Sequence, residues 1–263
     1  RAGEMPMITI KNEAQIQRMR EAGALLHSVL EELKTHVRPG VTTMQLDAMA
    51  EKMIRDAGAV PSFKGFEGFP STLCTSIDDQ VVHGFPDDTP LKEGQLLSID
   101  AGLVLNGWQA DSALSVAVGQ ASDEVMRLIE VTEQCFWLAA AQARAGNRLG
   151  DVAHAVQQHA EDNGYSVIRD LCGHGIGREM HEEPDVPNFG KPGRGIRLEA
   201  GMTIAIEPMI AKGRWPVYIG SNGWTVITRD HSLASHYEHT IAVTTGEPEI
   251  LTFPGANLRE AIR

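Results

Sequence analysis

The chain has 263 residues, of which 42% are hydrophobic, and this composition excludes a disordered chain and a coiled coil. It carries 23 Lys and Arg against 35 Asp and Glu, a net charge of −12. Because an acidic surface repels a phosphate backbone, we expect no DNA partner. We expect no membrane partner either, since no apolar run in the sequence approaches the roughly 18–20 residues of a membrane helix.

Helices and strands are predicted in chain order from the spacing of apolar residues. Thr42 and Gln45 form a capping box at the start of the second helix. The predicted helices cover 12–36, 42–58, about 122–144 and 151–164. The predicted strands cover 95–105, 109–118, 202–211, 223–228 and 238–244.

No linker rich in Pro, Gly or Ser divides the chain, so we predict a single catalytic domain over 11–253. Residues 1–10 are interpreted as an N-terminal tail or an expression remnant, and 254–263 as a C-terminal tail. Three widely spaced cysteines, Cys74, Cys135 and Cys172, are typical of reduced thiols. They predict a cytoplasmic protein, and we expect a monomer.

The chain contains two diverged copies of one unit. The decapeptide 91–100 matches 198–207 at Leu, Gly, Ile and the final acid, at an offset of 107 residues from 100 to 207. Upstream, an Arg-x-Gly motif precedes a helix in each copy at nearly the same offset. The repeats cover about 11–120 and 121–253, and they predict two pseudosymmetric halves with strands between outer helices.

Four carboxylates occur in or beside apolar strand segments. Asp100 and Asp111 flank a predicted turn at Asn106-Gly107, so we expect them to face each other across neighbouring strands. Glu207 and Glu238 lie in two later apolar segments. A carboxylate in an apolar strand is costly unless it is paired, protonated or bound to a cation. Four of them, related by an internal duplication, indicate a divalent-metal site.

One histidine agrees with that interpretation. His174 lies between glycines in Cys172-Gly173-His174-Gly175-Ile176-Gly177, where nothing shields the imidazole ring. One imidazole with four carboxylates suits two ions such as Mn, Fe, Co or Zn. Two ions bridged by carboxylates generate a hydroxide nucleophile for hydrolysis. The other histidines, apart from those in the motifs below, are interpreted as ordinary structural or surface residues.

Seven segments occur in order over about residues 12–250 and together resemble one family. They are Val82-His83-Gly84, Ile99-Asp100-Ala101-Gly102, Ala110-Asp111, Gly173-His174-Gly175-Ile176-Gly177, His181-Glu182-Glu183-Pro184, Ile206-Glu207-Pro208 and Tyr237-Glu238-His239-Thr240. The set resembles type I methionine aminopeptidase in its short bacterial form. The resemblance implies the α/β pita-bread fold, with two pseudosymmetric halves around a central dinuclear metal site.

The resemblance also implies an activity. It is the metal-dependent removal of the N-terminal methionine from nascent chains and peptides whose second residue is small, in contact with the ribosome. A hydroxide that bridges two divalent ions (Co, Mn, Fe or Zn) attacks the scissile carbonyl. Carried over by position, the five metal ligands are Asp100, Asp111, His174, Glu207 and Glu238.

Three further roles follow from the same resemblance. His83 contacts the substrate near the scissile amide, and His181 stabilises the tetrahedral intermediate at the carbonyl oxygen. We expect Glu207 to shuttle the proton as well as bind metal, because its spare oxygen can reach the attacking water.

The resemblance places the methionine side chain against an apolar, sulfur-containing wall, which suits a thioether. This wall comprises Phe66, Phe69, Cys74, Met180 and Trp224, with Phe63 as a possible addition. Some positions depart from the common family residue, and we expect none of them to contact a metal ligand. They are Phe66 and Phe69 for Tyr, Glu67 for His, Met180 for Phe, Asp78 for Asn and His236 for Gln.

Two alternatives come from other classes. A prolidase or Xaa-Pro aminopeptidase shares the fold but carries a long N-terminal domain, whereas barely a dozen residues precede the first predicted helix. An inactive homologue used as a binding module requires a lost ligand, and all five are present. Within the family, the span from His174 to Glu207 leaves no room for the type II helical insert. We therefore expect the short bacterial form rather than the eukaryotic type I form with its N-terminal zinc-binding region.

Overall fold

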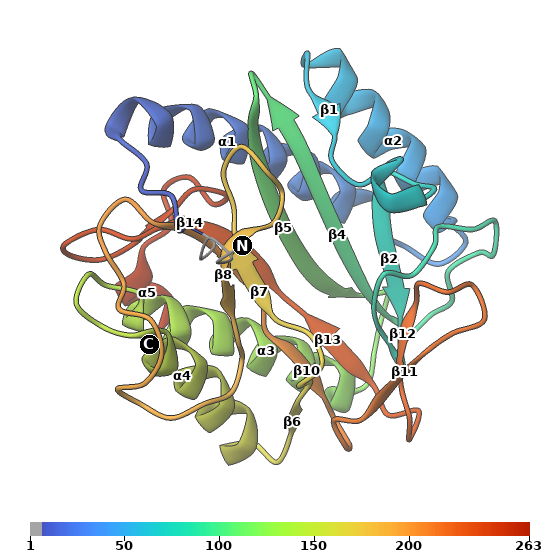
Figure 1. Ribbon diagram of the computed structural model, residues 1–263. Helices are drawn as coiled ribbons and strands as arrows, with labels where there is room; N and C mark the ends of the chain where they lie inside the picture. The colour runs from blue at the N-terminus through green and yellow to red at the C-terminus, as the bar shows by residue number, and fades with distance from the viewer. Residues whose placement is uncertain (1–6) are drawn as a thin grey trace, which may run out of the picture.

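An antiparallel sheet forms the centre of the protein, and the long helices lie together behind it in Figure 1. The computed structural model describes residues 7–263. The main sheet follows the order β1-β4-β5-β14-β9-β7-β8, with β2 beside β4 and β15 beside β14. Its strands are β1 (Val60–Pro61), β2 (Leu73–Ile77), β4 (Leu96–Leu105), β5 (Trp108–Ala117), β7 (Gly173–Gly175), β8 (Glu182–Val186), β9 (Thr203–Ile206), β14 (Glu238–Ala242) and β15 (Glu249–Ile250).

Two small sheets lie beside the main one. The first has the order β13-β10-β6 and the second β11-β12-β3. The predicted strand over 202–211 is interrupted, since Pro208 separates β9 from β10 and lacks the N–H that a continuous ladder requires. The strands are β3 (Gln80–Val82), β6 (Ser166–Val167), β10 (Met209–Ala211), β11 (Val217–Ile219), β12 (Val226–Thr228) and β13 (Ala234–His236).

The helices form close to their predicted positions. Asn12 and Thr42 cap the first two, and the side chain of Gln45 completes the predicted capping box. None of the helices between residues 7 and 263 combines the length and apolarity needed to cross a bilayer. Their bounds are α1 (Glu13–His36), α2 (Thr43–Asp56), α3 (Asp123–Gln142), α4 (Leu149–Asp162) and the short α5 (Leu258–Ala261), with a 3₁₀ turn, η1, at Phe66–Gly68.

The structure describes only part of the predicted N-terminal tail but all of the predicted C-terminal tail. Residues 1–6 of the predicted N-terminal tail lie outside the described residues. Lys11, just after that tail, is buried and pairs with Glu182 at 2.9 Å. Within the predicted C-terminal tail, α5 buries Leu258 against the cluster of apolar side chains that surrounds α3.

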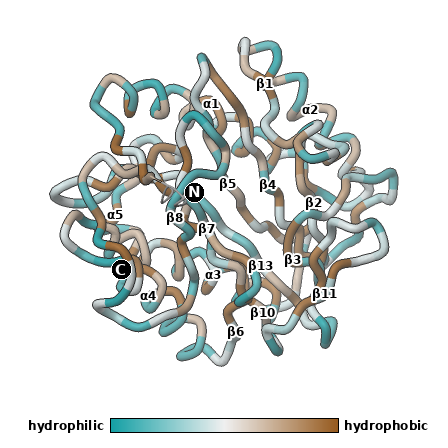
Figure 2. Tube along the Cα trace, in the orientation of Figure 1, coloured by the Kyte–Doolittle hydropathy of each residue, from teal (hydrophilic) through white to brown (hydrophobic). Residues whose placement is uncertain are grey.

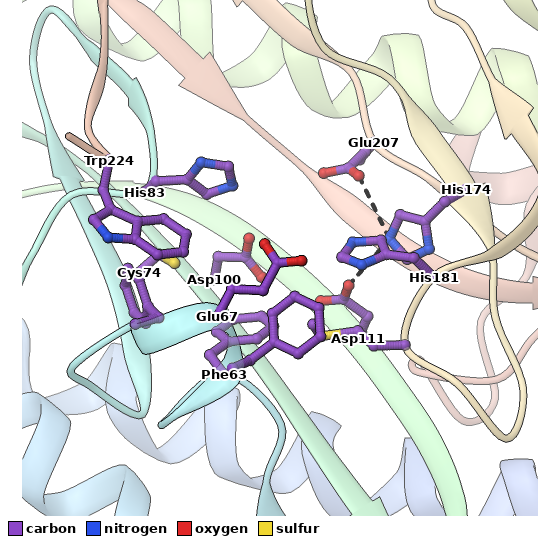
Figure 3. Close-up of a pocket in the computed structure, with 13 residues that line it drawn as sticks. Phe63, Glu67, Cys74, His83, Asp100, Asp111, His174, His181, Glu207 and Trp224 are labelled. Atoms are coloured by element: carbon purple, nitrogen blue, oxygen red, sulfur yellow. Dashed lines mark ion pairs between the residues drawn. The ribbon is translucent and has the colours of Figure 1, made fainter. Parts of the chain in front are cut away.

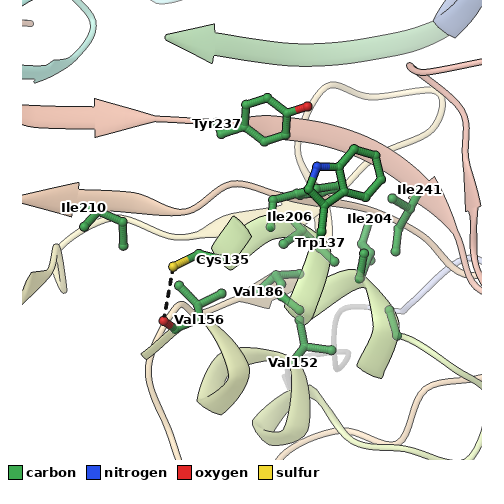
Figure 4. Close-up of a cluster of buried hydrophobic side chains, with 14 of the residues drawn as sticks. Cys135, Trp137, Val152, Val156, Val186, Ile204, Ile206, Ile210, Tyr237 and Ile241 are labelled. Carbon is green, nitrogen blue, oxygen red and sulfur yellow. Dashed lines mark hydrogen bonds between the residues drawn. The ribbon is translucent and has the colours of Figure 1, made fainter. Parts of the chain in front are cut away.

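The core consists mainly of two apolar clusters, one for each half of the chain. Leu26, Leu33 and Ile54 of α1 and α2 pack in one cluster with residues of β4. Phe136 of α3 and Val152 of α4 belong to the other, which includes residues of β9 and β14 (Figure 4). The brown segments of Figure 2 follow the strands beneath both helix pairs. The halves meet where β5 pairs with β14.

We expect the Phe136→Ala variant to lose about 3–5 kcal/mol of unfolding free energy. Phe136 is fully buried, and its ring packs 4.9 Å from Trp137, 5.1 Å from His239 and 5.5 Å from Tyr237 between centroids. Urea unfolding of the metal-free protein measures the loss. Met126→Ala on the exposed side of the same helix is the control and should change stability by less than about 0.5 kcal/mol. A loss below about 1 kcal/mol in Phe136→Ala would contradict the packing argument.

Candidate metal centre

The hairpin of β4 and β5 places two acidic side chains on one face of the sheet. Its turn, Asn106-Gly107, has φ values of 50° and 80°, which the expected tight hairpin turn requires. Asp111 lies opposite Gly102, and Asp100 lies opposite Ala113. The two acids are therefore diagonal neighbours on the same face. This confirms the expectation that they face each other across neighbouring strands.

Three neighbouring strands bring the remaining members of the predicted set to this point. Glu238 begins β14 and lies opposite Ala113 of β5. Glu207 directly follows β9, the next strand along the sheet. His174 lies on β7 opposite Ala205 of β9. Residues separated by more than a hundred positions in the sequence thus converge, because their strands are adjacent.

The imidazole of His174 faces three of these carboxylates, and Figure 3 shows it beside two of them, Glu207 and Asp111. Its Nε2 is 3.3 Å from Asp111 Oδ2, 3.7 Å from Glu207 Oε1 and 3.8 Å from Glu238 Oε1. On the other side of the ring, Nδ1 donates to the carbonyl oxygen of Gly175 at 2.8 Å. In the neutral ring this bond leaves the Nε2 lone pair free to bind a metal.

Several carboxylate oxygens of this cluster are buried and lack a hydrogen-bond partner within residues 7–263. They are Asp100 Oδ1, Asp111 Oδ1 and both side-chain oxygens of Glu238. Buried carboxylates without partners are costly, whereas a divalent cation placed between them satisfies all their oxygens. Carboxylate oxygen together with imidazole nitrogen suits Mn, Fe, Co and Zn. The side chains present therefore fit the metal that the sequence predicts.

The excess of negative charge in the cluster also shifts the pKa values of its side chains. Burial, followed by the charge of Asp111, raises the pKa of Asp100 and of Glu238 well above the ordinary range. Burial acts on the pKa of Asp111 in the same direction, but the hydrogen bond from His174 holds it below its usual value. Against the effect of burial, that bond and the charge of Glu207 raise the pKa of His174 to about 9. The cluster thus favours a positive charge beside Asp111.

A second buried histidine also contacts this cluster. His236 Nε2 lies 2.9 Å from Glu207 Oε2 and 3.9 Å from Glu238 Oε2. The expectation that no departure from the family pattern contacts a metal ligand is therefore wrong for His236. The sequence placed His236 on a different segment from Glu207, and only the pairing of β13 with β10 brings them together.

A cavity of about 190 Å³ opens onto the metal-binding side chains (Figure 3). All the residues predicted for the methionine wall line it. In addition, Glu67 lines the cavity with its backbone at a φ of 50°. The lining residues are Phe63, Phe66, Glu67, Phe69, Cys74, His83, Asp100, Asp111, His174, Met180, His181, Glu207 and Trp224.

The apolar part of this cavity is a cluster built on aromatic contacts. The ring of Phe69 meets Trp224 edge-on at 5.2 Å between centroids and Phe85 at 5.4 Å. Phe85 was not predicted from the sequence, although it follows the His83-Gly84 motif directly. Phe66 is 42% exposed, which places it at the mouth of the cavity rather than in its interior.

The two histidines predicted to contact substrate lie on different sides of the carboxylate cluster (Figure 3). His83 has a φ of 61° and faces Trp224 at 6.4 Å between ring centroids. His181 packs against His174 at 4.3 Å and near Phe66 at 6.0 Å. Burial lowers the pKa of both rings, and the charge of His174 lowers that of His181 further. Both rings are therefore neutral near pH 7 and can donate a hydrogen bond.

Comparison with known proteins gives one consistent result. The sequence profile described as metallopeptidase family M24 matches residues 17–245. The methionine aminopeptidase of Clostridium perfringens is 51% identical over 246 residues, which is 94% of this chain and 99% of that protein. Methionine aminopeptidase 1 of Bacillus subtilis is 43% identical over 94% of this chain and 99% of that protein.

A solved structure supports the same relationship. The crystal structure of methionine aminopeptidase from Rickettsia prowazekii has a TM-score of 0.93 and 41% sequence identity. The match covers 94% of this chain and 100% of that one. The resemblance seen in the motifs and the predicted pita-bread fold are both confirmed.

We expect Asp111→Asn to lose metal binding and at least about 100-fold in activity while the fold persists. The substitution removes the carboxylate that lies nearest to His174 Nε2. Metal content after dialysis and the circular dichroism spectrum check both parts. Asp88→Asn, at an exposed position, is the matched control and should bind metal normally. Wild-type metal affinity in Asp111→Asn would contradict the assignment.

Proposed function

Because the chain belongs to metallopeptidase family M24, we propose that it removes the N-terminal methionine from proteins and peptides whose second residue is small. The observation that carries the proposal is the convergence of His174 and four carboxylates beside an apolar cavity. High identity to methionine aminopeptidases over nearly the whole chain supports it.

The metal centre consists of two divalent ions held by the predicted five ligands. Asp111 and Glu238 come from paired strands at the junction of the two halves, and they would hold the ions together with the other three side chains. Bound there, such ions polarise the scissile carbonyl and lower the pKa of the attacking water. Glu207, which faces the cavity, accepts the proton of that water at a carboxylate oxygen and returns it to the leaving amine.

The two neutral histidines orient the substrate. His181 donates to the carbonyl oxygen, where negative charge develops in the transition state. His83 contacts the peptide near the scissile amide. The methionine side chain occupies the apolar part of the cavity, where Phe69, Cys74 and Trp224 exclude water from it.

The alternatives have less support. A proline-directed relative shares the fold, but the 51% identity to an aminopeptidase covers 94% of this chain. A binding module without activity requires a missing ligand, whereas all five side chains meet at one point. The family resemblance further supports a cytoplasmic monomer that acts on nascent chains at the ribosome.

Treatment with a chelator should abolish hydrolysis of a Met-Gly-Met peptide, and addition of Mn, Fe or Co should restore it. Among the described residues, the cavity lining contains no Ser and only one Cys, Cys74. Burial raises the pKa of the Cys74 thiol, which disfavours the thiolate that a cysteine nucleophile requires. Released methionine measures the rate. Met-Leu-Met and an Xaa-Pro dipeptide are the comparison substrates and should be cleaved poorly. Full activity in excess chelator, or preference for the Xaa-Pro dipeptide, would refute the proposal.

Replacing His181 by Ala should lower kcat by about 100- to 1,000-fold, because the variant loses a donor to the developing oxyanion. Metal content and melting temperature should stay close to those of the wild type, since His181 completes no ligand set. Steady-state kinetics and metal analysis test this together. His36→Ala, on α1 and with a side chain that is 38% exposed, is the control. A variant that keeps its kcat, or loses metal in proportion to activity, would show that His181 has another role.

A further inference from the structure

Two histidines, not one, face the carboxylates of the metal centre. Glu207 lies between them, with Oε1 at 3.7 Å from His174 Nε2 and Oε2 at 2.9 Å from His236 Nε2. Glu238 lies between them in the same way, at 3.8 Å and 3.9 Å. Each glutamate therefore presents one oxygen to each imidazole. This arrangement is the one expected for two ions that are bridged by carboxylates and that each bind one nitrogen.

Side-chain atoms of the cluster also group into two sets of three that share one member. Ligand atoms of Asp111, His174 and Glu238 lie within 4.8 Å of one another, and so do those of Asp100, His236 and Glu238. The first set contains the imidazole predicted from the sequence. The second set contains His236, which neither the motifs nor the resemblance assigns to the metal.

The backbone of His236 is held in place by contacts on both sides. His236 ends β13, where it pairs with Met209 two residues beyond Glu207. On its other side, the His236 N–H donates to Ser115 Oγ at 3.1 Å, and Ser115 Oγ donates to the His236 carbonyl oxygen at 2.7 Å. The side chain is only 1% exposed. The imidazole is therefore presented to the carboxylates before any ligand binds, as in preorganised metal sites.

We propose that His236 is a sixth protein ligand, which supplies a nitrogen donor to the second ion together with Asp100 and Glu238. This inference rests on the dinuclear centre of the proposed function. It adds that each ion has one imidazole. Since imidazole suits Zn and Fe whereas carboxylate suits Mn, the second position should favour Zn or Fe over Mn more strongly than carboxylates alone would.

A simpler role for His236 is donation of a hydrogen bond to Glu207, and the 2.9 Å contact fits that as well. That role does not account for the position of the imidazole beside Asp100 and Glu238, whose ligand atoms lie with those of His236 within 4.8 Å of one another. An ion placed among Asp100, His236 and Glu238 satisfies oxygens of both residues at once. Coordination therefore accounts for the grouping of all three side chains, whereas the hydrogen bond accounts only for the contact with Glu207.

X-ray absorption spectroscopy of the protein loaded with two equivalents of Co²⁺ tests the proposal directly, because imidazole rings give a distinct multiple-scattering signal. We expect one imidazole per ion in the wild type and one per two ions in His236→Gln. Gln is the variant of choice since its amide can still donate a hydrogen bond to Glu207. His36→Gln on α1 is the control for the loss of an imidazole outside the cluster and should match the wild type.

Calorimetric titration with Zn²⁺ and with Mn²⁺ supplies a second readout that does not depend on activity. In His236→Gln we expect the weaker of the two sites to lose on the order of 100-fold in Zn²⁺ affinity and less in Mn²⁺ affinity. Circular dichroism of the metal-free variant confirms that it is folded.

Two results would overturn the assignment. One is a wild-type protein that binds two ions with one imidazole per two ions. The other is a His236→Gln variant whose Zn²⁺ affinities equal those of the wild type, which would leave His236 as a hydrogen-bond donor to Glu207. Both results leave the aminopeptidase activity standing. A wild-type protein that binds no metal would instead refute the proposed function itself.

Discussion

The concentration of four carboxylates in a buried site is the constraint on which the rest of the structure depends. Asp100, Asp111 and Glu238 are at most 9% exposed, and several of their oxygens have no hydrogen-bond partner in the described chain. Like charges at such short range repel, so packing elsewhere must hold them together until a cation binds. Burial and this repulsion between like charges raise the pKa values of Asp100 and Glu238.

Packing within the two halves of the chain holds these carboxylates together against their mutual repulsion. Each half buries an apolar cluster under its own helix pair, and each contributes carboxylates from a strand next to the junction. Asp100 and Asp111 come from the first half and Glu207 and Glu238 from the second. The site therefore exists only when β5 pairs with β14. Metal binding should consequently stabilise the contact between halves, since ligand binding to the native state alone favours folding.

The cavity has a charged part and an apolar part, which suit different ligands. Its inner part is charged and suits cations, whereas the cluster of Phe69, Cys74 and Trp224 beside it is apolar and suits a thioether. His83 and His181 lie between these parts on opposite sides, and burial keeps both neutral. Neutral donors stabilise developing negative charge without competing with metal ions for the carboxylates. Glu67 adds a further acid to the lining, at a position where the family resemblance expects His.

Local signals in the sequence were sufficient for the helices, the β4–β5 hairpin and the choice of His174 and the four carboxylates that converge, because each depends on periodicity or on a short motif. The contact of His236 with Glu207 depends instead on tertiary structure. His236 lies two residues before Glu238, but no pattern in the sequence marks it as a ligand. It reaches the site because β13 pairs with β10 and because Ser115, from the other half of the chain, binds its backbone. The sequence alone therefore determined which chemistry is present. Only the packing of distant strands decided which imidazoles face the carboxylates, since proximity between such strands leaves no periodic trace along the chain.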